Sequence, residues 1–309
     1  MKVYNSIQSY DKTKQTIVTI GTFDGVHVGH KKIIERIVSS TENGKYESLI
    51  LTFFPHPRMV LGGSPDIRLL NTLEEKQMLL EKTGLDSLVV HPFDAEFSQL
   101  SAEEFVKQVL VDAFSTKKII IGHDHRFGKS RSADFNDLIL FGEKYGFEVE
   151  QISVQEVNDV SVSSTKIRAA LTEGNMEVAN NFLGYDYMFT GKVVLGKQLG
   201  RTLGFPTANL EITEEYKLIP GDGVYIVRSN IPGVTYGMMN IGNRPTVDGS
   251  RRTIEVHYLD FKANLYDQHI EVQIIQRLRD EKKFASVDLL RQQLEQDLHS
   301  VRQYLQWWY

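Results

Sequence analysis

The sequence predicts two domains: an α/β domain with a parallel sheet, then a small antiparallel six-stranded β-barrel with a C-terminal helix. Three observations predict this fold. The chain has 309 residues, which is enough for two cores. Strand-like and helix-like segments alternate up to Val154, which is typical of parallel strands joined by helices. From Met188 onward, six short strand-like segments are separated by turn residues, which is typical of a small barrel.

Composition excludes several classes of protein. The chain is 41% hydrophobic and 24% charged, as in globular proteins. No uncharged apolar run approaches membrane-spanning length and the first residues lack a signal-peptide core, so we expect no membrane association. The absence of cysteine excludes disulfides and thiolate chemistry and favours a cytoplasmic location. The net charge is -5 without a long basic run, so we expect no nucleic-acid partner.

Apolar β-branched runs and capping patterns define the elements of the first domain. Capping boxes, in which Glu follows Thr or Ser by three residues, open two helices at Thr72 and Ser101. The predicted strands are Thr16–Ile20, Ser48–Phe54, Ser87–Val90, Lys118–Ile121 and Phe147–Val154, and the predicted helices are Gly29–Ser39, Thr72–Lys82, Ser101–Phe114 and Asp134–Tyr145. Polar and glycine-rich residues follow the first, second and fourth strands. Because ligands bind beyond the carboxyl ends of such strands, we expect one composite site there.

After Gly184 the alternation of strands and helices gives way to short strands separated by turns, so we predict domains at 1–184 and 185–309. Two short helices precede the change, at Ile167–Leu171 and Met176–Leu183. The predicted barrel strands are Gly191–Leu195, Asn209–Ile212, Gly223–Ser229, Tyr236–Ile241, Arg252–Leu259 and His269–Leu278. A helix from about Val287 carries leucines on one face, and we expect it to pack against the barrel.

The segment Gly21–His30 is a glycine-rich turn between the first strand and the first helix. Glycines let a phosphate approach the backbone, and the start of the helix offers free N–H groups and a positive dipole end. His27 and His30 form an H-x-G-H pattern, and protonated imidazoles there could stabilise charge on a phosphoryl group or on departing pyrophosphate. The alternative is a pair of ordinary surface histidines.

A second phosphate-binding candidate is Ser163–Arg168, which places three hydroxyls at a helix start and two cations in the next turn. Hydroxyls and helix-start N–H groups suit phosphates, and Arg168 could bind them in bidentate fashion. The alternative is a plain helix cap followed by a solvated basic face.

Together these two segments resemble the nucleotidyltransferase signatures of bacterial bifunctional riboflavin kinase/FAD synthetases. The resemblance implies a Rossmann-like nucleotidyltransferase fold and an FMN adenylyltransferase activity for the first domain. It implies that His27, His30 and Arg168 are catalytic. It also implies that the ATP-binding residues are Gly21, Thr22, Phe23, Asp24, Gly29, Ser163, Ser164 and Thr165.

The resemblance extends to Phe53–Pro57 and to Gly122–Gly128, segments that follow the second and fourth predicted strands. It implies a flavin-binding side made of Phe54, Pro55, His56, Asp124 and Arg126. The sequence departs from the family pattern D-F-R-F-G at one position, where His125 replaces the first aromatic residue.

In the second domain, Gly200–Asn209 is a glycine-flanked loop that ends in a hydroxyl and a carboxamide. Residues two apart on an extended chain face the same side, so Thr207 and Asn209 could offer two oxygens to one hard cation. The alternative is a barrel turn capped by Thr and Asn. Glu255 lies inside an apolar strand, where an unpaired carboxylate is costly. It could instead be a charge on the outer face.

The second domain resembles the flavokinase family through G-x-x-x-G-R-x-x-G-F-P-T-A-N, and further through Gly223–Tyr225, Asn240–Thr246 and Ile254–His257. The resemblance implies that Glu255 is the base for the ribityl 5′-hydroxyl and that Thr207 and Asn209 hold Mg²⁺. His257 is interpreted as structural. The implied ATP-binding residues are Gly200, Arg201, Gly204, Phe205, Pro206, Thr207 and Asn209.

The expected function is therefore two-step synthesis of a flavin cofactor. ATP phosphorylates riboflavin to FMN and ADP in the barrel, and a second ATP adenylylates FMN to FAD with release of pyrophosphate. Two alternatives remain. The first domain could act on another phosphorylated substrate, or the chain could be a flavin-binding regulator without catalysis.

Overall fold

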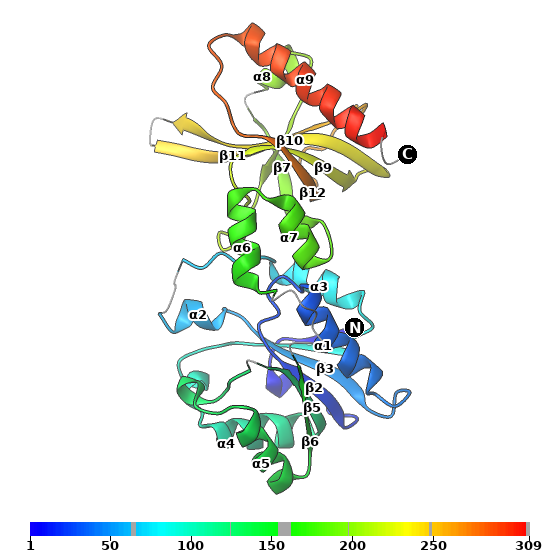
Figure 1. Ribbon diagram of the computed structural model, residues 1–309, viewed down its shortest axis with the longest axis vertical. Coiled ribbons are helices and arrows are strands. Elements are labelled where there is room, and N and C mark those ends of the chain that lie inside the picture. Colours follow the sequence, from blue (N-terminus) through cyan, green and yellow to red (C-terminus); the bar gives the residue numbers. More distant parts are fainter. Residues whose placement is uncertain (63–65, 124, 154–161, 197, 247–248, 307–309) are drawn as a thin grey trace. The chain divides into compact units, whose positions relative to one another are not determined.

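The computed structural model describes residues 1–62, 66–123, 125–153, 162–196, 198–246 and 249–306. The chain forms two compact units, Met1–Ser163 and Ser164–Tyr309, and each is described by itself (Figure 1).

The first unit contains a six-stranded parallel sheet in the order β1-β4-β3-β2-β5-β6. Its strands are β1 Lys2–Tyr4, β2 Thr16–Ile20, β3 Glu47–Phe53, β4 Ser87–His91, β5 Thr116–Gly122 and β6 Glu148–Ile152. The predicted parallel sheet is confirmed, with five of the strands close to their predicted bounds. The sequence missed β1, which pairs in parallel with β4, because three residues are too few to show an alternating pattern.

The helices of this unit begin where the capping patterns predict. Thr72 and Glu75 form the capping box of α3, and Ser101 and Glu104 form that of α4. The helices are α1 Val28–Ser39, α2 Pro57–Val60, α3 Leu73–Glu81, α4 Ala102–Phe105 and α5 Phe135–Tyr145. The predicted helix Ser101–Phe114 is two segments, because α4 continues as a π-helix, η3 Val106–Ala113.

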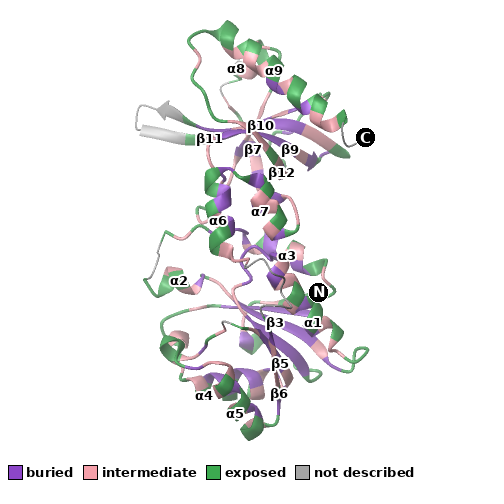
Figure 2. Ribbon diagram, in the orientation of Figure 1, coloured by how far each residue is buried: buried purple, intermediate pink, exposed green. Residues whose placement is uncertain are grey.

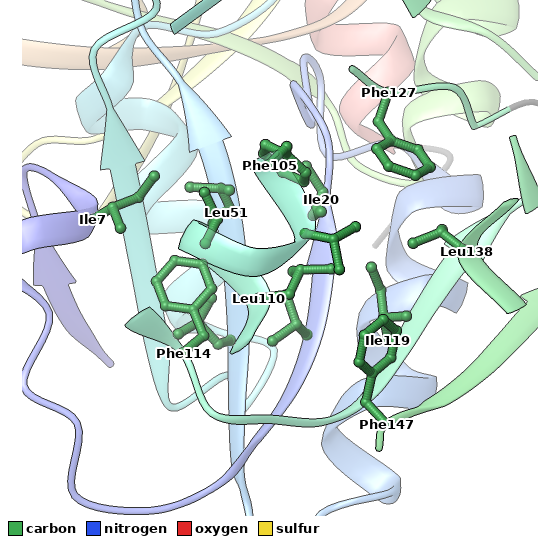
Figure 3. Close-up of a cluster of buried hydrophobic side chains, with 14 of the residues drawn as sticks. Ile7, Ile20, Leu51, Phe105, Leu110, Phe114, Ile119, Phe127, Leu138 and Phe147 are labelled. Carbon is green, nitrogen blue, oxygen red and sulfur yellow. The ribbon is translucent and has the colours of Figure 1, made fainter. Parts of the chain in front are cut away.

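Alternating strand residues build a core on each face of the sheet. On one face, Ile20, Leu51 and Ile119 pack under η3 and α5 (Figure 3). On the other face, Ile17, Ile50 and Ile120 pack under α1 and α3. The central strands β2, β3 and β4 are buried, whereas the helices expose their outer faces (Figure 2). Two covered faces leave the ends of the strands as the place for a site.

The second unit contains a closed barrel in the order β10-β11-β8-β7-β12-β9, with antiparallel neighbours. All six predicted strands are present, as β7 Tyr187–Val194, β8 Ala208–Glu211, β9 Gly223–Asn230, β10 Val234–Thr246, β11 Gly249–Tyr258 and β12 His269–Arg279. The sequence did not predict the four-residue helix α8 Leu199–Thr202.

The predicted C-terminal helix is α9 Val287–Gln306. Its apolar face, with Val301 fully buried, packs on Val224, Ile226 and Met238 of the barrel. Asp297 fixes the helix further: its carboxylate accepts hydrogen bonds from Arg279 at the end of β12, at 2.7 to 3.1 Å.

Two helices, α6 Ser164–Glu173 and α7 Met176–Leu183, belong to the unit that contains the barrel. Helix α7 packs on β7 and β12, and its Asn180 Nδ2 donates to the carbonyl of Ile274 at 2.9 Å. At the end of α6, the Leu171 carbonyl accepts from the Gly221 N–H at 2.9 Å, and the Glu173 carbonyl accepts from Arg277 at 3.2 Å. The compact units thus divide before α6. The boundary after Gly184 stays a prediction about where the two activities divide.

Candidate active sites

The turn between β2 and α1 has an unusual backbone. Phe23, Gly25 and Val26 all have positive φ angles, of 47°, 91° and 38°. Such angles suit glycine but are strained for a β-branched residue such as Val26. The turn therefore needs support from its surroundings. The Gly21 N–H donates to the Leu51 carbonyl at 3.1 Å, and the Val26 N–H donates to the Phe23 carbonyl at 3.2 Å.

The two histidines lie at the start of α1. His27 is the N-cap, and its Nδ1 accepts a hydrogen bond from the backbone N–H of His30 at 3.3 Å. The two rings stack, with their centroids 3.6 Å apart. Because Nδ1 of His27 accepts, its neutral ring carries the proton on Nε2. His30 Nδ1 is buried and has no hydrogen-bond partner among the described residues.

Burial sets the charge of both imidazoles. It lowers the pKa of His27 to about 4. It also lowers the pKa of His30 well below its ordinary value, helped by the neighbouring His27 and Lys76. Both rings are therefore neutral in the free protein near pH 7. The protonated form expected from the sequence would need a bound anion to favour it.

The other predicted ATP-binding residues of this turn have local contacts. Thr22 offers its carbonyl to Thr52 Oγ1 at 3.1 Å and to Lys76 Nζ at 2.7 Å. Asp24 is buried, and its carboxylate accepts from the Leu70 N–H at 2.9 Å. Gly29 is buried in α1, and a Cβ on Gly21 would lie 3.1 Å from the Phe23 ring.

The predicted flavin-binding residues of this unit follow β3 and β5. Phe54 packs on the core beneath α1 and α3, Pro55 is exposed, and His56 is the N-cap of α2. Arg126 lines a cavity of 690 Å³ with His123, His125, Arg131, Asp134, Phe135, Asn136 and Gln151. His125 stacks on Phe127, with ring centroids 6.1 Å apart. Asp124 lies outside the described residues.

Ser163 ends the first unit, and Ser164, Thr165 and Arg168 lie in the first turn and a half of α6. The predicted helix start is therefore present, one turn earlier than its apolar pattern indicated. Their shared role with His27 and His30 stays a prediction.

The barrel brings its predicted residues together. Thr207 Oγ1 donates to Glu255 Oε2 at 3.2 Å. Glu255 pairs directly with Asn209 of β8 and with Asn240 of β10, so all three side chains share one face of the sheet. His257 Nδ1 lies 2.8 Å from the Pro206 carbonyl, and its ring packs edge-on against Phe205. These contacts fit the structural role expected for His257.

Close packing explains the glycines of the loop before β8. A Cβ on Gly200 would lie 2.2 Å from the Phe205 carbonyl oxygen, and a Cβ on Gly196 would lie 2.2 Å from the Asn209 side chain. Both distances are too short for a real Cβ; at Gly200 the obstacle is backbone, whereas at Gly196 the Asn209 side chain would have to move. Gly204 instead faces open space and has a φ of 85°. The loop is thus folded tightly around Thr207 and Asn209.

A cavity of 580 Å³ adjoins this loop. Arg201, Pro206 and Thr207 line it on one side. The remaining walls are mainly apolar, from Val193, Ala208, Val256, Tyr258, Phe261, Lys262, Ala263, Asn264, Leu265 and Tyr266. Its size and lining are typical of a pocket for a small organic ligand. The segment Phe261–Tyr266 could not be predicted as part of a site, because it has no glycine or charge pattern to mark it.

Thr207, Asn209 and Glu255 are oxygen donors, which suit Mg²⁺. Among the described residues, no three or more His, Asp or Glu side chains form a metal-binding group. A Mg²⁺ ion takes several ligands from phosphates and water, so this small donor set fits it.

No described helix is long and apolar enough to cross a membrane.

Each unit contains a glycine-rich loop, as transferases that bind the phosphates of a nucleotide do. A family model described as FAD synthetase matches residues 9–166, and one described as riboflavin kinase matches residues 183–305. The chain is 35% identical over 312 residues to the bifunctional riboflavin kinase/FMN adenylyltransferase of Escherichia coli K12, with 98% of each chain covered. It is 38% identical to the Listeria monocytogenes enzyme of that description, with 93% of this chain and 91% of that one covered. The chain therefore belongs to the bifunctional riboflavin kinase/FMN adenylyltransferase family.

A solved structure gives the same fold. It is described as a macrolide-efflux protein from Streptococcus pneumoniae, and it matches with a TM-score of 0.89 and 30% identity over 97% of this chain and 98% of that one.

Proposed function

We propose that this chain makes FMN and then FAD, with one ATP consumed in each step. The barrel phosphorylates riboflavin to FMN, and the α/β unit adenylylates FMN to FAD. Membership of the family over nearly the whole chain supports both activities. The substrates and products are then riboflavin, FMN, FAD, ATP, ADP and pyrophosphate, and we expect a cytoplasmic location.

In the kinase reaction, Glu255 takes the proton from the 5′-hydroxyl of riboflavin as the hydroxyl oxygen attacks the γ-phosphorus of ATP. The bond from γ-phosphorus to the bridging oxygen breaks, and ADP leaves. The hydrogen bond from Thr207 to Glu255 is the observation that best supports this assignment, because it puts the base beside the predicted phosphate loop. Mg²⁺, held by Thr207 and Asn209, would neutralise charge on the phosphates.

The cavity of 580 Å³ is our candidate for the adenosine of this ATP. Arg201 and Thr207 line it, and both belong to the predicted phosphate loop. Tyr258, Phe261 and Tyr266 supply aromatic faces against which an adenine could stack.

In the adenylyltransferase reaction, a phosphate oxygen of FMN attacks the α-phosphorus of ATP. The bond from α-phosphorus to the bridging oxygen breaks, and pyrophosphate leaves. The nucleophile is already an anion, so no general base is required. We propose that the Nε2–H of His27 and the N–H groups at the start of α1 donate to the phosphates. Arg168 and the hydroxyls of Ser163, Ser164 and Thr165 would bind the departing pyrophosphate.

We propose that Phe54, Pro55, His56, Asp124 and Arg126 bind the flavin of FMN. Arg126 lines the cavity of 690 Å³ with a second arginine, Arg131, and with His123. These groups suit an anionic substrate.

Separation of products over time tests both activities together. The protein is incubated with riboflavin, ATP and Mg²⁺, and samples are separated by chromatography. We expect FMN to appear first and FAD later. FMN without FAD would contradict the second activity. FAD from supplied FMN but no FMN from riboflavin would contradict the first.

A further inference from the structure

Lys76 is a buried lysine that the proposed mechanism does not use. It lies in α3 and is only 5% exposed. Its Nζ donates a hydrogen bond of 2.7 Å to the carbonyl of Thr22, the residue that enters the strained turn before α1. Burial of an ammonium group is costly unless the group is well paired, so this contact needs an explanation.

The Thr22 carbonyl has a second donor. Thr52 Oγ1 of β3 binds it at 3.1 Å, so the two donors hold this oxygen from different elements. The next four residues include all three positive φ angles of the turn, at Phe23, Gly25 and Val26. A strained turn persists only where its surroundings fix it. The two hydrogen bonds therefore fix the direction of the Thr22 carbonyl, at the residue where the chain enters the phosphate loop.

Asp24 makes the reciprocal connection. Its buried carboxylate accepts from the N–H groups of Leu70 and Asn71, at 2.9 and 3.4 Å. These residues come directly before Thr72, the N-cap of α3. Helix α3 and the phosphate loop are thus joined twice. Lys76 reaches from the helix to the loop, and Asp24 reaches from the loop to the segment that begins the helix.

We propose that Lys76 is a positioning residue for adenylyl transfer: with Asp24 it fixes the phosphate loop to α3, and so sets the direction of the N–H groups and imidazoles that meet the triphosphate of ATP. This inference rests on the proposed adenylyltransferase function. It assigns Asp24 to anchoring the loop.

The test compares Lys76→Met with Lys82→Met in the full-length protein. Methionine keeps most of the aliphatic stem and removes the ammonium, and Lys82 is an exposed lysine at the end of the same helix. We expect Lys76→Met to lower kcat for FMN adenylylation by about 10- to 100-fold, the loss typical of a small displacement of groups in a reaction site. Riboflavin phosphorylation by the same molecules should stay within about twofold, and Lys82→Met should match wild type in both reactions.

A second readout tests whether the Lys76 ammonium acts on His30 in the folded protein. The titratable groups that act on His30 are His27 and Lys76, and both lower its pKa. Removal of Lys76 should therefore raise the pKa of His30, measured by NMR titration of its ring. A Lys76→Met protein that is less stable but adenylylates FMN at the wild-type kcat, per folded molecule, would overturn the proposal.

Thr52→Val gives a test if Lys76→Met does not fold. Valine has nearly the shape of threonine and removes only the second donor to Thr22. We expect a smaller fall in the adenylylation kcat, with kinase activity kept. An unchanged kcat in this variant would contradict the role of the Thr22 carbonyl. If wild type makes no FAD at all, the proposed function fails instead.

Discussion

At the scale of single residues, burial decides which groups carry charge. The imidazoles of His27 and His30 are neutral near pH 7 because burial lowers the pKa of each. A neutral ring still donates through one nitrogen, so His27 can hydrogen-bond a phosphate without a net charge. A bound phosphate anion would stabilise the protonated form and raise the pKa again.

The lowered pKa of His27 predicts that the stability of the fold depends on pH. The pKa of His27 is 6.5 when unfolded and about 4 when folded. Between these values the unfolded chain binds a proton that the folded chain does not, so stability falls as the pH falls from 6.5 to about 4. His27→Asn keeps an N-cap acceptor and removes the titration. Relative to this variant, wild type should lose up to about 3 kcal/mol across that window. Urea unfolding followed by circular dichroism measures both proteins, and equal pH profiles would contradict the prediction.

Glu255 gives a second prediction at this scale. Glu255→Gln keeps the size of the side chain and removes the base. Riboflavin phosphorylation should fall by about 10²- to 10⁴-fold, the usual contribution of general base catalysis. Adenylylation of supplied FMN should be unchanged, because Glu255 is not among the residues proposed for that reaction. Glu271→Gln in β12 is the control, and both rates should match wild type there. Near-normal phosphorylation by Glu255→Gln would remove Glu255 from the mechanism.

At the scale of elements, local patterns predicted most of the fold. Capping boxes at Thr72 and Ser101 form as predicted, since each depends only on residues three apart. The face shared by Thr207 and Asn209 could also be read from the sequence. The contact of Lys76 with the phosphate loop could not be predicted, because its partner Thr22 is 54 residues away in the sequence. The available signal was weak: Lys76 is three residues after Leu73 and four before Leu80, on the apolar side of α3.

Two glycines of the second unit, one packed and one facing open space, allow a matched pair of variants. Gly200→Ala would place a Cβ 2.2 Å from the Phe205 carbonyl oxygen, so the loop before β8 must shift and move Thr207. Kinase kcat/KM should fall by about tenfold or more, since small displacements in a reaction site are costly. Gly233→Ala, between β9 and β10, meets open space and adds only the strain of a positive φ, about 1 kcal/mol. Its kinase rate should stay within about threefold of wild type. Equal losses in the two variants would show that close packing at Gly200 is unimportant.

At the scale of the whole molecule, the compact units and the sequence motifs divide the chain at different places. The motif Ser163–Arg168 matches the adenylyltransferase signature, yet α7 packs on the barrel and α6 packs on α7. Sequence patterns could not predict this, because the contacts that hold α6 come from Gly221 and Arg277, far along the chain.

This arrangement predicts how fragments behave. A fragment of 164–309 keeps α6 and α7, whereas one of 185–309 loses them. The shorter fragment exposes the surface of β7 and β12 that α7 covers, and it leaves Arg277 without the Glu173 carbonyl. We expect it to be on the order of 3 kcal/mol less stable, given the apolar side chains that these helices bury. Both fragments should phosphorylate riboflavin when folded, because Thr207, Asn209 and Glu255 lie in the barrel. Thermal unfolding and kinase assays of the two fragments test this. Equal stability would mean that α6 and α7 contribute nothing to the barrel, and loss of activity in both would mean that the kinase needs the α/β unit.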